Sequence, residues 1–421
     1  MHVVFFNRSF YPDISSTGNL LTDLCEDLIR DHGCRVSVIT GPPLKPLGDL
    51  PPSGPGLVTR ETYRGIEIHR ARGTRFDKRR FSGRAANYVS YFLSACWAGL
   101  RVDRPDVVVA LTDPPIIGLA GVLAGKKAGA PLVMVFQDLF PEVTALLPDF
   151  HSDTINAMLQ GISRFLCRRA TRMVALGPTM RQRLIDNKGA RPERIEIIEN
   201  WADTSTIVPG TKPNPYSDAH GLSDKFVVMH SGNLGLSQNL ETLVDAAAAL
   251  GDIPDLAVVF LGDGVKKADL QARVASLGLT NVMFLPFVDK NHLADPFATA
   301  DLFIVSLQRG LAGYIVPSKL YGFLAAGKPY IAAVEADCEV MALTHHHECG
   351  VAAEPGDIAD LAAKIRDCYH NREELTRMGV NARAASLAFD RRRQVEKYYT
   401  LCRAVAGPRH NARAVSAPQV S

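Results

Sequence analysis

The feature that most constrains the fold is a regular alternation of short apolar segments with amphipathic ones in both halves of the chain. The first half opens with an apolar segment at 3–6, and the leucines of 20–32 then share one face of a predicted helix. The apolar segment at 226–230 begins a second series of the same kind. Strands that alternate with helices form parallel sheets, so each half is predicted to be a doubly wound α/β unit. Such units bind ligands at the carboxyl ends of their strands.

The remaining elements follow the same pattern along the chain. The other predicted strands are the apolar segments 36–40, 107–111, 132–136, 173–176, 258–261, 282–285, 301–307 and 330–334. The other predicted helices cover 240–250, 265–277, 358–369 and 377–405, the last broken near 389–390.

The length of the chain predicts two domains, because 421 residues are too many for one core. We predict an N-terminal domain over 1–201 and a second domain over 202–388, in which the Pro/Gly-rich residues 202–224 form the linker and lead-in. A helix over 389–405 is expected to cross back to the N-terminal domain. The polar tail, 406–421, is expected to be disordered.

Composition narrows the class of protein. With 22% charged and 47% hydrophobic residues the chain is globular, and its net charge of +3 predicts no nucleic-acid partner. Eight scattered cysteines without a Cys-x-x-Cys pair predict neither a zinc site nor a disulfide framework. The chain opens on a predicted strand at 2–6, not on a signal peptide, and no apolar segment reaches transmembrane length. We therefore expect a cytoplasmic location.

The segment 316–329 has the strongest local signature of a site. Pro317 and Ser318 are start signals of a helix, and Gly327 is a stop signal. The side chain of Ser318 can accept a hydrogen bond from an unpaired backbone N–H. Lys319 falls in the first turn, next to free amides. A helix start of this kind favours a bound phosphate. The alternative is an ordinary capped helix with an exposed lysine.

A basic segment directly precedes an aromatic helix in the first half. The basic residues are Arg64, Arg70, Arg72, Arg75, Lys78, Arg79, Arg80 and Arg84, and the aromatic and apolar ones are Tyr88, Tyr91, Phe92, Leu93 and Trp97. Residues 64–97 could therefore hold the protein as a peripheral protein on an anionic membrane surface. A solvated loop followed by a core-facing helix is the equal alternative. The Pro/Gly-rich residues 41–60 are expected to form a surface loop.

Several short motifs occur in the order of one known family. They are His230-Ser-Gly-Asn-Leu-Gly235, Gln238-Asn-Leu-Glu241, Leu261-Gly-Asp-Gly264, the stretch Pro317-Ser-Lys to Pro329, Gln137-Asp-Leu-Phe-Pro-Glu142 and Asn200-Trp201. Over roughly 1–405 the chain resembles glycosyltransferase family 4, especially the bacterial subgroup that builds colanic-acid, O-antigen and other exopolysaccharide repeat units. The resemblance implies the GT-B fold: two Rossmann-like doubly wound domains that face each other across a cleft.

The resemblance also implies a reaction and its partners. A retaining glycosyltransferase of the hexosyl or N-acetylhexosaminyl type would bind a nucleotide-diphosphate sugar to the second domain and a lipid-linked or other saccharide acceptor to the first. It implies no metal and no cofactor. Gly18 is expected to let the backbone approach the diphosphate, with a positive φ. The candidate site residues are Asp138, Gln137 and Lys319 for catalysis; Gly18, Gly232, Asn233, Gly235, Gln238, Ser318 and Lys319 for the donor phosphates; Phe287 and Val288 for the base; and Thr17, Asn19 and Glu142 for the acceptor.

Each motif has a structural alternative. Glycines at 232 and 235 suit any tight turn, Asp138 could cap a helix, and Phe287 with Val288 could simply pack. The run 345–347 with Cys349 invites a metal reading, but adjacent side chains point in different directions. A loop or a helix end is the better interpretation of that run.

The chain departs from the family pattern at its charged positions. The two glutamates of the family's Glu-x7-Glu fall at Tyr314 and Gly322, and its arginine and lysine for the diphosphate fall at Asn233 and Asn239. The acceptor-side histidine falls at Gln137. Two rival functions therefore stay open: a GT-B sugar-nucleotide epimerase, and a non-catalytic partner subunit of the same fold.

Overall fold

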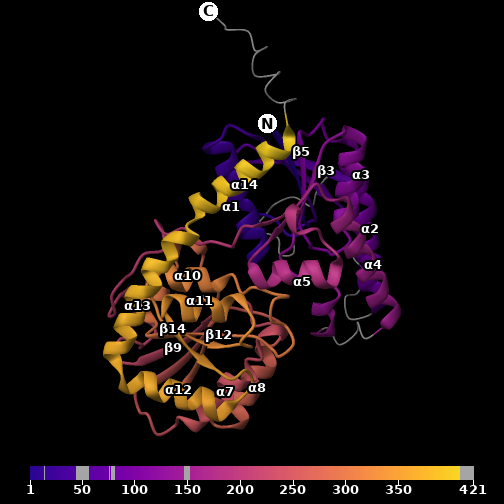
Figure 1. Cartoon of the computed structure of the whole chain (residues 1–421). Helices are drawn as coiled ribbons and strands as arrows, with labels where there is room; N and C mark the ends of the chain where they lie inside the picture. The colour runs from indigo at the N-terminus through magenta and orange to yellow at the C-terminus, as the bar shows by residue number, and fades with distance from the viewer. Residues whose placement is uncertain (14, 44–55, 75, 77–80, 147–151, 408–421) are drawn as a thin grey trace, which may run out of the picture. The chain divides into compact units, whose positions relative to one another are not determined.

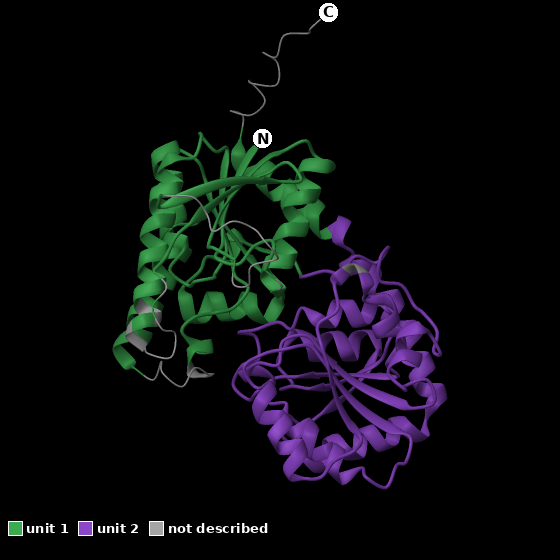
Figure 2. Ribbon diagram, turned by 180° about the vertical axis from the view of Figure 1, so that it is seen from behind, with its two compact units in different colours: residues 1–199, 394–421 green, residues 200–393 purple. Residues whose placement is uncertain are grey.

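The computed structural model describes residues 1–13, 15–43, 56–74, 76, 81–146 and 152–407. The chain divides into two compact units, shown in different colours in Figure 2. Unit 1 comprises Met1–Glu199 together with Gln394–Ser421, and unit 2 comprises Asn200–Arg393. From residue 408 the expected disordered tail lies outside the described residues.

Unit 1 contains an eight-stranded sheet in the order β3-β4-β2-β1-β5-β6-β7-β8, in which only the β3–β4 pair is antiparallel. Its strands are β1 (His2–Phe6), β2 (Arg35–Thr40), β3 (Val58–Tyr63), β4 (Ile66–Ala71), β5 (Val107–Ala110), β6 (Leu132–Val135), β7 (Arg172–Ala175) and β8 (Ile195–Ile197). The predicted parallel α/β unit is confirmed, and each predicted strand of this half is present within about two residues, the usual uncertainty of strand ends.

Apart from the C-terminal one, the helices of unit 1 connect consecutive strands of this sheet. They are α1 (Ser16–Arg30), α2 (Phe81–Arg101), α3 (Gly118–Ala128), α4 (Asp153–Arg169), α5 (Pro178–Lys188) and the C-terminal α14 (Arg391–Ala406), with 3-10 segments at Glu142–Leu146 and Pro192–Arg194. The later turns of α14 pack on this unit: Tyr399 stacks on His32 with ring centroids 3.9 Å apart, and Lys397 pairs with Glu199 at 2.8 Å.

The β3–β4 hairpin was not predicted, because residues 58–71 read as the end of a loop and the start of a basic segment. Its turn uses two left-handed residues, Arg64 and Gly65, at φ 46° and 82°. Ile66 and Ile68 are buried, while much of the other strand is exposed and charged. Arg70 is only 4% exposed and binds Glu61, so it belongs to the interior of the unit and not to a basic surface.

Unit 2 contains a six-stranded, wholly parallel sheet in the order β11-β10-β9-β12-β13-β14. Its strands are β9 (Phe226–Ser231), β10 (Leu256–Leu261), β11 (Val282–Leu285), β12 (Leu302–Ser306), β13 (Tyr330–Ala333) and β14 (Gly350–Ala353). Alternate residues of β9 enter two different cores: Val227 and Met229 pack with α10, whereas Phe226 and Val228 pack with α7 and α12. The sheet is therefore covered on both faces, as Figure 1 shows.

The helices of unit 2 complete the doubly wound pattern. They are α6 (Pro215–Ala219), α7 (Glu241–Ala249), α8 (Lys267–Ser276), α9 (Ala294–Thr299), α10 (Lys319–Ala325), α11 (Glu339–His347), α12 (Ile358–His370) and α13 (Arg372–Ser386), with 3-10 segments at Leu236–Gln238, Lys290–His292 and Leu387–Phe389. The predicted break near 389–390 is confirmed, because α13 and α14 are separate helices.

In both sheets the order of the strands reverses next to the first strand. In unit 2, β9 lies between β10 and β12, and in unit 1, β1 lies between β2 and β5. Loops that leave neighbouring strands in opposite directions open a crevice at the carboxyl edge of the sheet, where ligands of such sheets bind. Among the helices in the described residues, none combines the length and the apolar character needed to cross a membrane.

Gly262, directly after β10, provides a stability test of this edge. Its φ is 151°, and a Cβ there would lie 1.9 Å from the carbonyl oxygen of Gly232. We expect Gly262→Ala to lower the free energy of unfolding by about 1–3 kcal/mol or more, because both backbones must shift. Urea unfolding followed by circular dichroism measures this. The matched control is Gly278→Ala, at φ 62° with open space around it; equal losses in both variants would show that strain at positive φ, and not the close approach, sets the cost.

Candidate functional site

The loop after β9 is held by the loop after β10. Gly232, at φ 117°, donates its amide to Leu261 O at 2.9 Å, and Leu234 donates to Asp263 O at 2.9 Å. Gly262 and Gly264 allow this, because a Cβ at Gly264 would lie 2.3 Å from Leu234 O. The turn that was singled out in the sequence is therefore a rigid element at the crevice of unit 2.

Three candidate donor residues lie close together within this loop, and two of them are hydrogen-bonded to each other. The Gly235 amide donates to Gln238 Oε1 at 3.0 Å, and the missing Cβ of Gly235 leaves room for Asn233, whose Nδ2 would lie 2.5 Å away. The Gly235 amide that the sequence offered to a phosphate is thus occupied in this structure. Roles of Asn233, Gly235 and Gln238 toward a ligand remain predictions.

Lys319 contacts the imidazole of His230 within unit 2. Lys319 Nζ lies 2.9 Å from His230 Nε2, and it would lie 3.5 Å from a Cβ at Gly232. His230, on β9, is fully buried. In the described part of the chain, no carboxylate pairs with Lys319, although the side chain is half-buried.

The electrostatics of this pair follow from burial. Desolvation lowers the pKa of Lys319 to about 7. Burial, and then the charge of Lys319, lower the pKa of His230 well below its ordinary value, while a backbone interaction with Asn233 opposes that shift. The imidazole is therefore neutral at physiological pH, and the pair carries at most the single positive charge of the lysine.

The start of α10 differs from the prediction in its cap. The helix begins at Lys319 and has seven residues, and Ser318 makes no side-chain cap hydrogen bond to it, so the expected serine cap is wrong. At Gly322, where the family places a glutamate, a Cβ would lie 3.0 Å from Phe297 Cε2. Packing against Phe297 accounts for the absence of a carboxylate at that position.

The two candidate base-binding residues follow β11. Phe287 is 39% exposed, and Val288 is half-buried and packs against the core that contains α10. The contact of Val288 agrees with the packing alternative, whereas Phe287 has an exposed ring available for stacking. Their role in binding a base remains a prediction.

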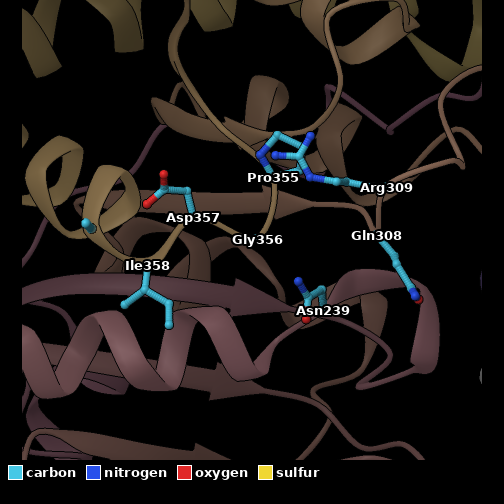
Figure 3. A pocket seen from close by; sticks show the side chains of 8 residues that line it. Asn239, Gln308, Arg309, Pro355, Gly356, Asp357 and Ile358 are labelled. Atoms are coloured by element: carbon cyan, nitrogen blue, oxygen red, sulfur yellow. The ribbon is translucent and has the colours of Figure 1, made fainter.

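An open pocket of about 640 Å³ lies at the carboxyl edge of the sheet of unit 2 (Figure 3). Asn239, in a left-handed conformation at φ 47°, lines it together with Gln308 and the start of α12. Arg309 also lines it but forms an ion pair with Glu354. Unlike Lys319, this cation has a counter-charge within the protein.

In unit 1, Gly18 lies in the first turn of α1 and not in a loop. The expected positive φ is wrong, because Gly18 is not among the residues with left-handed backbone. Its amide donates to the N-cap oxygen Ser15 Oγ at 3.1 Å, and a Cβ would lie 2.6 Å from that oxygen. Gly18 therefore makes room for the cap. Thr17 and Asn19 share this turn and are half-buried.

Asp138 and Gln137 follow β6, at the carboxyl edge of unit 1. Their amides lie 3.4 and 3.3 Å from Thr112 Oγ1, on the chain that leaves β5. Burial, and then the nearby charge of Asp113, raise the pKa of Asp138 to about 6. Ser9, after β1, donates to Asp113 Oδ2 at 2.5 Å. Within the described residues, no donor reaches the Asp138 carboxylate.

Glu142 has a structural partner that the sequence did not reveal. Its carboxylate accepts from Lys188 Nζ at 2.8 Å, and Lys188 has no exposed side-chain surface. The same ammonium donates to Phe140 O at 2.7 Å. Glu142 thus neutralises a buried lysine, and its acceptor-side role remains a prediction.

Sequence reasoning missed His230, Asp113 and Ser9 as parts of the two edges. Each had a weak signal: His230 is a polar residue in an otherwise apolar strand, and the other two lie in the short segments that follow predicted strands. The histidine run 345–347 closes α11, and within the described residues no group of three His, Cys, Asp or Glu side chains could hold a metal ion.

Asp138 should destabilise the folded protein at neutral pH. Its folded pKa, about 6, exceeds the ordinary 3.8, so the folded state binds more protons between these values and loses stability as pH rises through them. We expect Asp138→Asn to raise the apo Tm by several degrees near pH 7 and to change it little near pH 4. Thermal melts across this range measure the effect. Asp113→Asn, which removes the like charge, should give a smaller rise. If Asp138→Asn changes the Tm relative to wild type by the same amount at both pH values, the account is contradicted.

Comparisons with known proteins agree with this architecture. Residues 19–201 match the model of the glycosyl transferase 4-like domain, and residues 215–385 match that of glycosyl transferases group 1. The probable glycosyltransferase WbjE of Pseudomonas aeruginosa is 29% identical over 299 residues, 69% of this chain and 73% of that protein. The putative colanic acid biosynthesis glycosyl transferase WcaI of Escherichia coli is 24% identical over 387 residues, 87% and 91% of the two chains.

Solved structures show the same fold. HepE of Anabaena, in complex with UDP-glucose, superposes with a TM-score of 0.69 at 22% identity, covering 95% of this chain and 99% of that one. WaaG, a glycosyltransferase involved in lipopolysaccharide biosynthesis, gives a TM-score of 0.71 at 16% identity, covering 96% and 100%. The fold is therefore GT-B. Because the two matched regions together span most of both units, the chain belongs to the family 4-like glycosyltransferases.

Proposed function

We propose that the protein is a retaining glycosyltransferase that binds a nucleotide-diphosphate sugar through unit 2. The observation that carries this proposal is the ammonium of Lys319, which meets a neutral imidazole and no carboxylate. A half-buried cation without a counter-charge favours an anionic ligand. The anion replaces the favourable interaction with water that the ammonium lost on burial. It lies beside Gly232, at the switch point of a parallel sheet, where the diphosphate of such a ligand would bind.

The proposed chemistry explains why this charge matters. When the sugar is transferred, the bond between the anomeric carbon and the diphosphate oxygen breaks, and the leaving nucleoside diphosphate gains negative charge. Asn233 and Asn239 stand where the family has cations, so they offer amides instead of charge. Lys319 then supplies the stabilising charge in a partly water-excluded site. HepE, in its complexes with UDP and with UDP-glucose, binds a donor of this class.

We further propose that unit 1 binds the acceptor, a lipid-linked saccharide of a surface polysaccharide. The names of WcaI and WaaG, which refer to colanic acid and lipopolysaccharide, support this class. In a same-face reaction the acceptor oxygen bonds to the anomeric carbon, and its proton passes to the leaving phosphate. No protein nucleophile is then needed. The Asp138 carboxylate, which has no donor among the described residues, accepts a hydrogen bond from the acceptor and orients it. The proposed transfer reaction requires no metal ion.

A nucleotide-sugar panel tests the function as a whole. The protein is incubated with UDP-, GDP-, ADP- and dTDP-sugars, with and without a membrane extract and with excess chelator, and release of the nucleoside diphosphate is followed. Release that depends on the extract and survives the chelator is expected. Conversion of the sugar without an acceptor would identify an epimerase. Absence of turnover with every sugar would contradict the proposal and favour a partner subunit.

Lys319→Met is the sharpest single substitution for this proposal. We expect turnover to fall roughly 100- to 1,000-fold, as for the loss of one oxyanion donor. The folded pKa of Lys319, about 7, is below the ordinary 10.5, so the unfolded state binds more protons between these values and the lysine destabilises the fold at and below neutral pH.

The unliganded Lys319→Met protein should therefore melt higher than wild type near pH 6. The matched control is Lys328→Met, another lysine of unit 2 with a pKa lowered by burial, to about 8, and a bond to the carbonyl of Ala298. Its turnover should stay near wild type. Unchanged turnover in Lys319→Met, or a large loss of its stability, would make Lys319 a structural residue.

We also propose that α2 contacts an anionic membrane surface. Val89, Leu93 and Trp97, at helical spacing, are 52%, 62% and 43% exposed, and the Arg101 guanidinium lies 3.7 Å from the centre of the Trp97 ring. An apolar stripe that ends in a cation suits a bilayer with negative headgroups. Of the predicted basic segment, Arg75 and residues 78–80 lie outside the described residues, so the proposal depends on α2.

Leu93→Asp tests this contact. The variant should lose most of its co-sedimentation with phosphatidylglycerol vesicles, and wild-type binding should weaken with salt, because exposed charges are screened within about 8 Å at physiological ionic strength. Val265→Asp, at an exposed apolar residue of unit 2, is the matched control and should bind as wild type. Equal binding of all three proteins would contradict the proposal.

A further inference from the structure

His230 differs from an ordinary partner of a buried lysine. An ammonium group has only donors, so with Lys319 protonated the 2.9 Å contact requires His230 Nε2 to accept, and the ring is then neutral. A carboxylate at this position would accept equally well, but it would also cancel the charge of Lys319. The imidazole holds the ammonium in place and leaves its charge available.

The described residues around the pair also bring no negative charge to it. His230 is fully buried on β9, with the ring of Phe260 from β10 at a centroid distance of 6.2 Å. The loop after β9 contributes Gly232 and the backbone of Asn233, and α10 contributes Lys319 itself. Among the described residues, no acid pairs with either member. The contact is therefore built without any negative charge.

We propose that His230 is a positioning residue that holds the amino group of Lys319 beside Gly232 without a negative partner, so that its protonated form can meet the diphosphate of the donor. The inference deepens the proposed function and rests on it for the identity of the anion. It assigns to β9 a role that neither the glycines of the loop nor the start of α10 supplies: the placement of the ammonium. A hydrogen-bond acceptor at residue 230 must be present, and it must be uncharged.

Three substitutions separate these two requirements. His230→Gln keeps a neutral acceptor, His230→Leu removes the acceptor, and His230→Asp keeps an acceptor but adds a negative charge. UDP is the probe, and its affinity is measured by calorimetry near pH 7. We expect the affinity of the Gln variant for UDP to lie within a few-fold of that of wild type. Leu should bind about 10- to 100-fold more weakly, the range expected for a hydrogen bond to a charged group. Asp should bind weakest of all.

A second readout concerns Lys319 in the unliganded protein. Acetylation of its amine is followed by mass spectrometry as a function of pH, because only the neutral amine reacts. Compared with wild type, the reaction should begin at lower pH in the Leu variant, which lacks an acceptor for the charged form. In the Asp variant it should begin at higher pH, because the carboxylate favours the ammonium. A His230 that merely filled space would leave this profile unchanged.

Lys319→Met provides the coupling control. In that background the Gln and Leu variants should bind UDP equally, since no ammonium remains to be placed. If wild type binds no UDP but the acetylation profiles shift as expected, the proposed donor site fails while the His230–Lys319 pairing stands. A Leu variant whose acetylation profile is identical to that of wild type overturns the inference. So does an Asp variant that binds UDP as tightly as the Gln variant.

Discussion

The proposed function depends on one electrostatic constraint: a lysine is taken out of water at the crevice of unit 2 and receives no negative partner. The desolvation of an ammonium is costly, and proteins usually offset it with a carboxylate. Lys188 in unit 1 shows that usual solution, because Glu142 neutralises it at 2.8 Å. Lys319 meets only an imidazole at a similar distance. The contrast between the two lysines distinguishes a structural cation from one kept for a ligand.

Rigid loops at the carboxyl edge of the sheet of unit 2 position this lysine. The parallel sheet brings the ends of β9 and β10 together, and the glycines at 262 and 264 let the following loops touch. That contact fixes Gly232, and α10 brings Lys319 to its side. In unit 1 the same edge holds Asp138, whose raised pKa reflects burial and the neighbouring Asp113. In each unit, a destabilised ionisable group therefore lies at the carboxyl edge of a sheet, where ligands bind.

Periodicity was sufficient to predict most of the sheets, because buried parallel strands are continuous apolar segments and their helices are amphipathic. It failed for the β3–β4 hairpin, where one exposed strand carries charged residues and an interior arginine resembled surface charge. Gly18 was misjudged because a glycine after a strand suggests a turn, whereas here it lies under the serine that caps α1. The partner of Lys319 could not be predicted, since 89 residues separate it from His230.

The central claim is that Lys319 binds the diphosphate as a cation, although burial leaves much of it neutral in the free protein near pH 7. Ligand binding must then bring a proton with it. Calorimetric titration of UDP near pH 8, in buffers that differ in ionisation enthalpy, measures this uptake directly. The account predicts the uptake of nearly one proton per UDP bound by wild type, and a clearly smaller uptake by Lys319→Met. Equal proton uptake by both proteins, or tight binding to wild type without any, would contradict it.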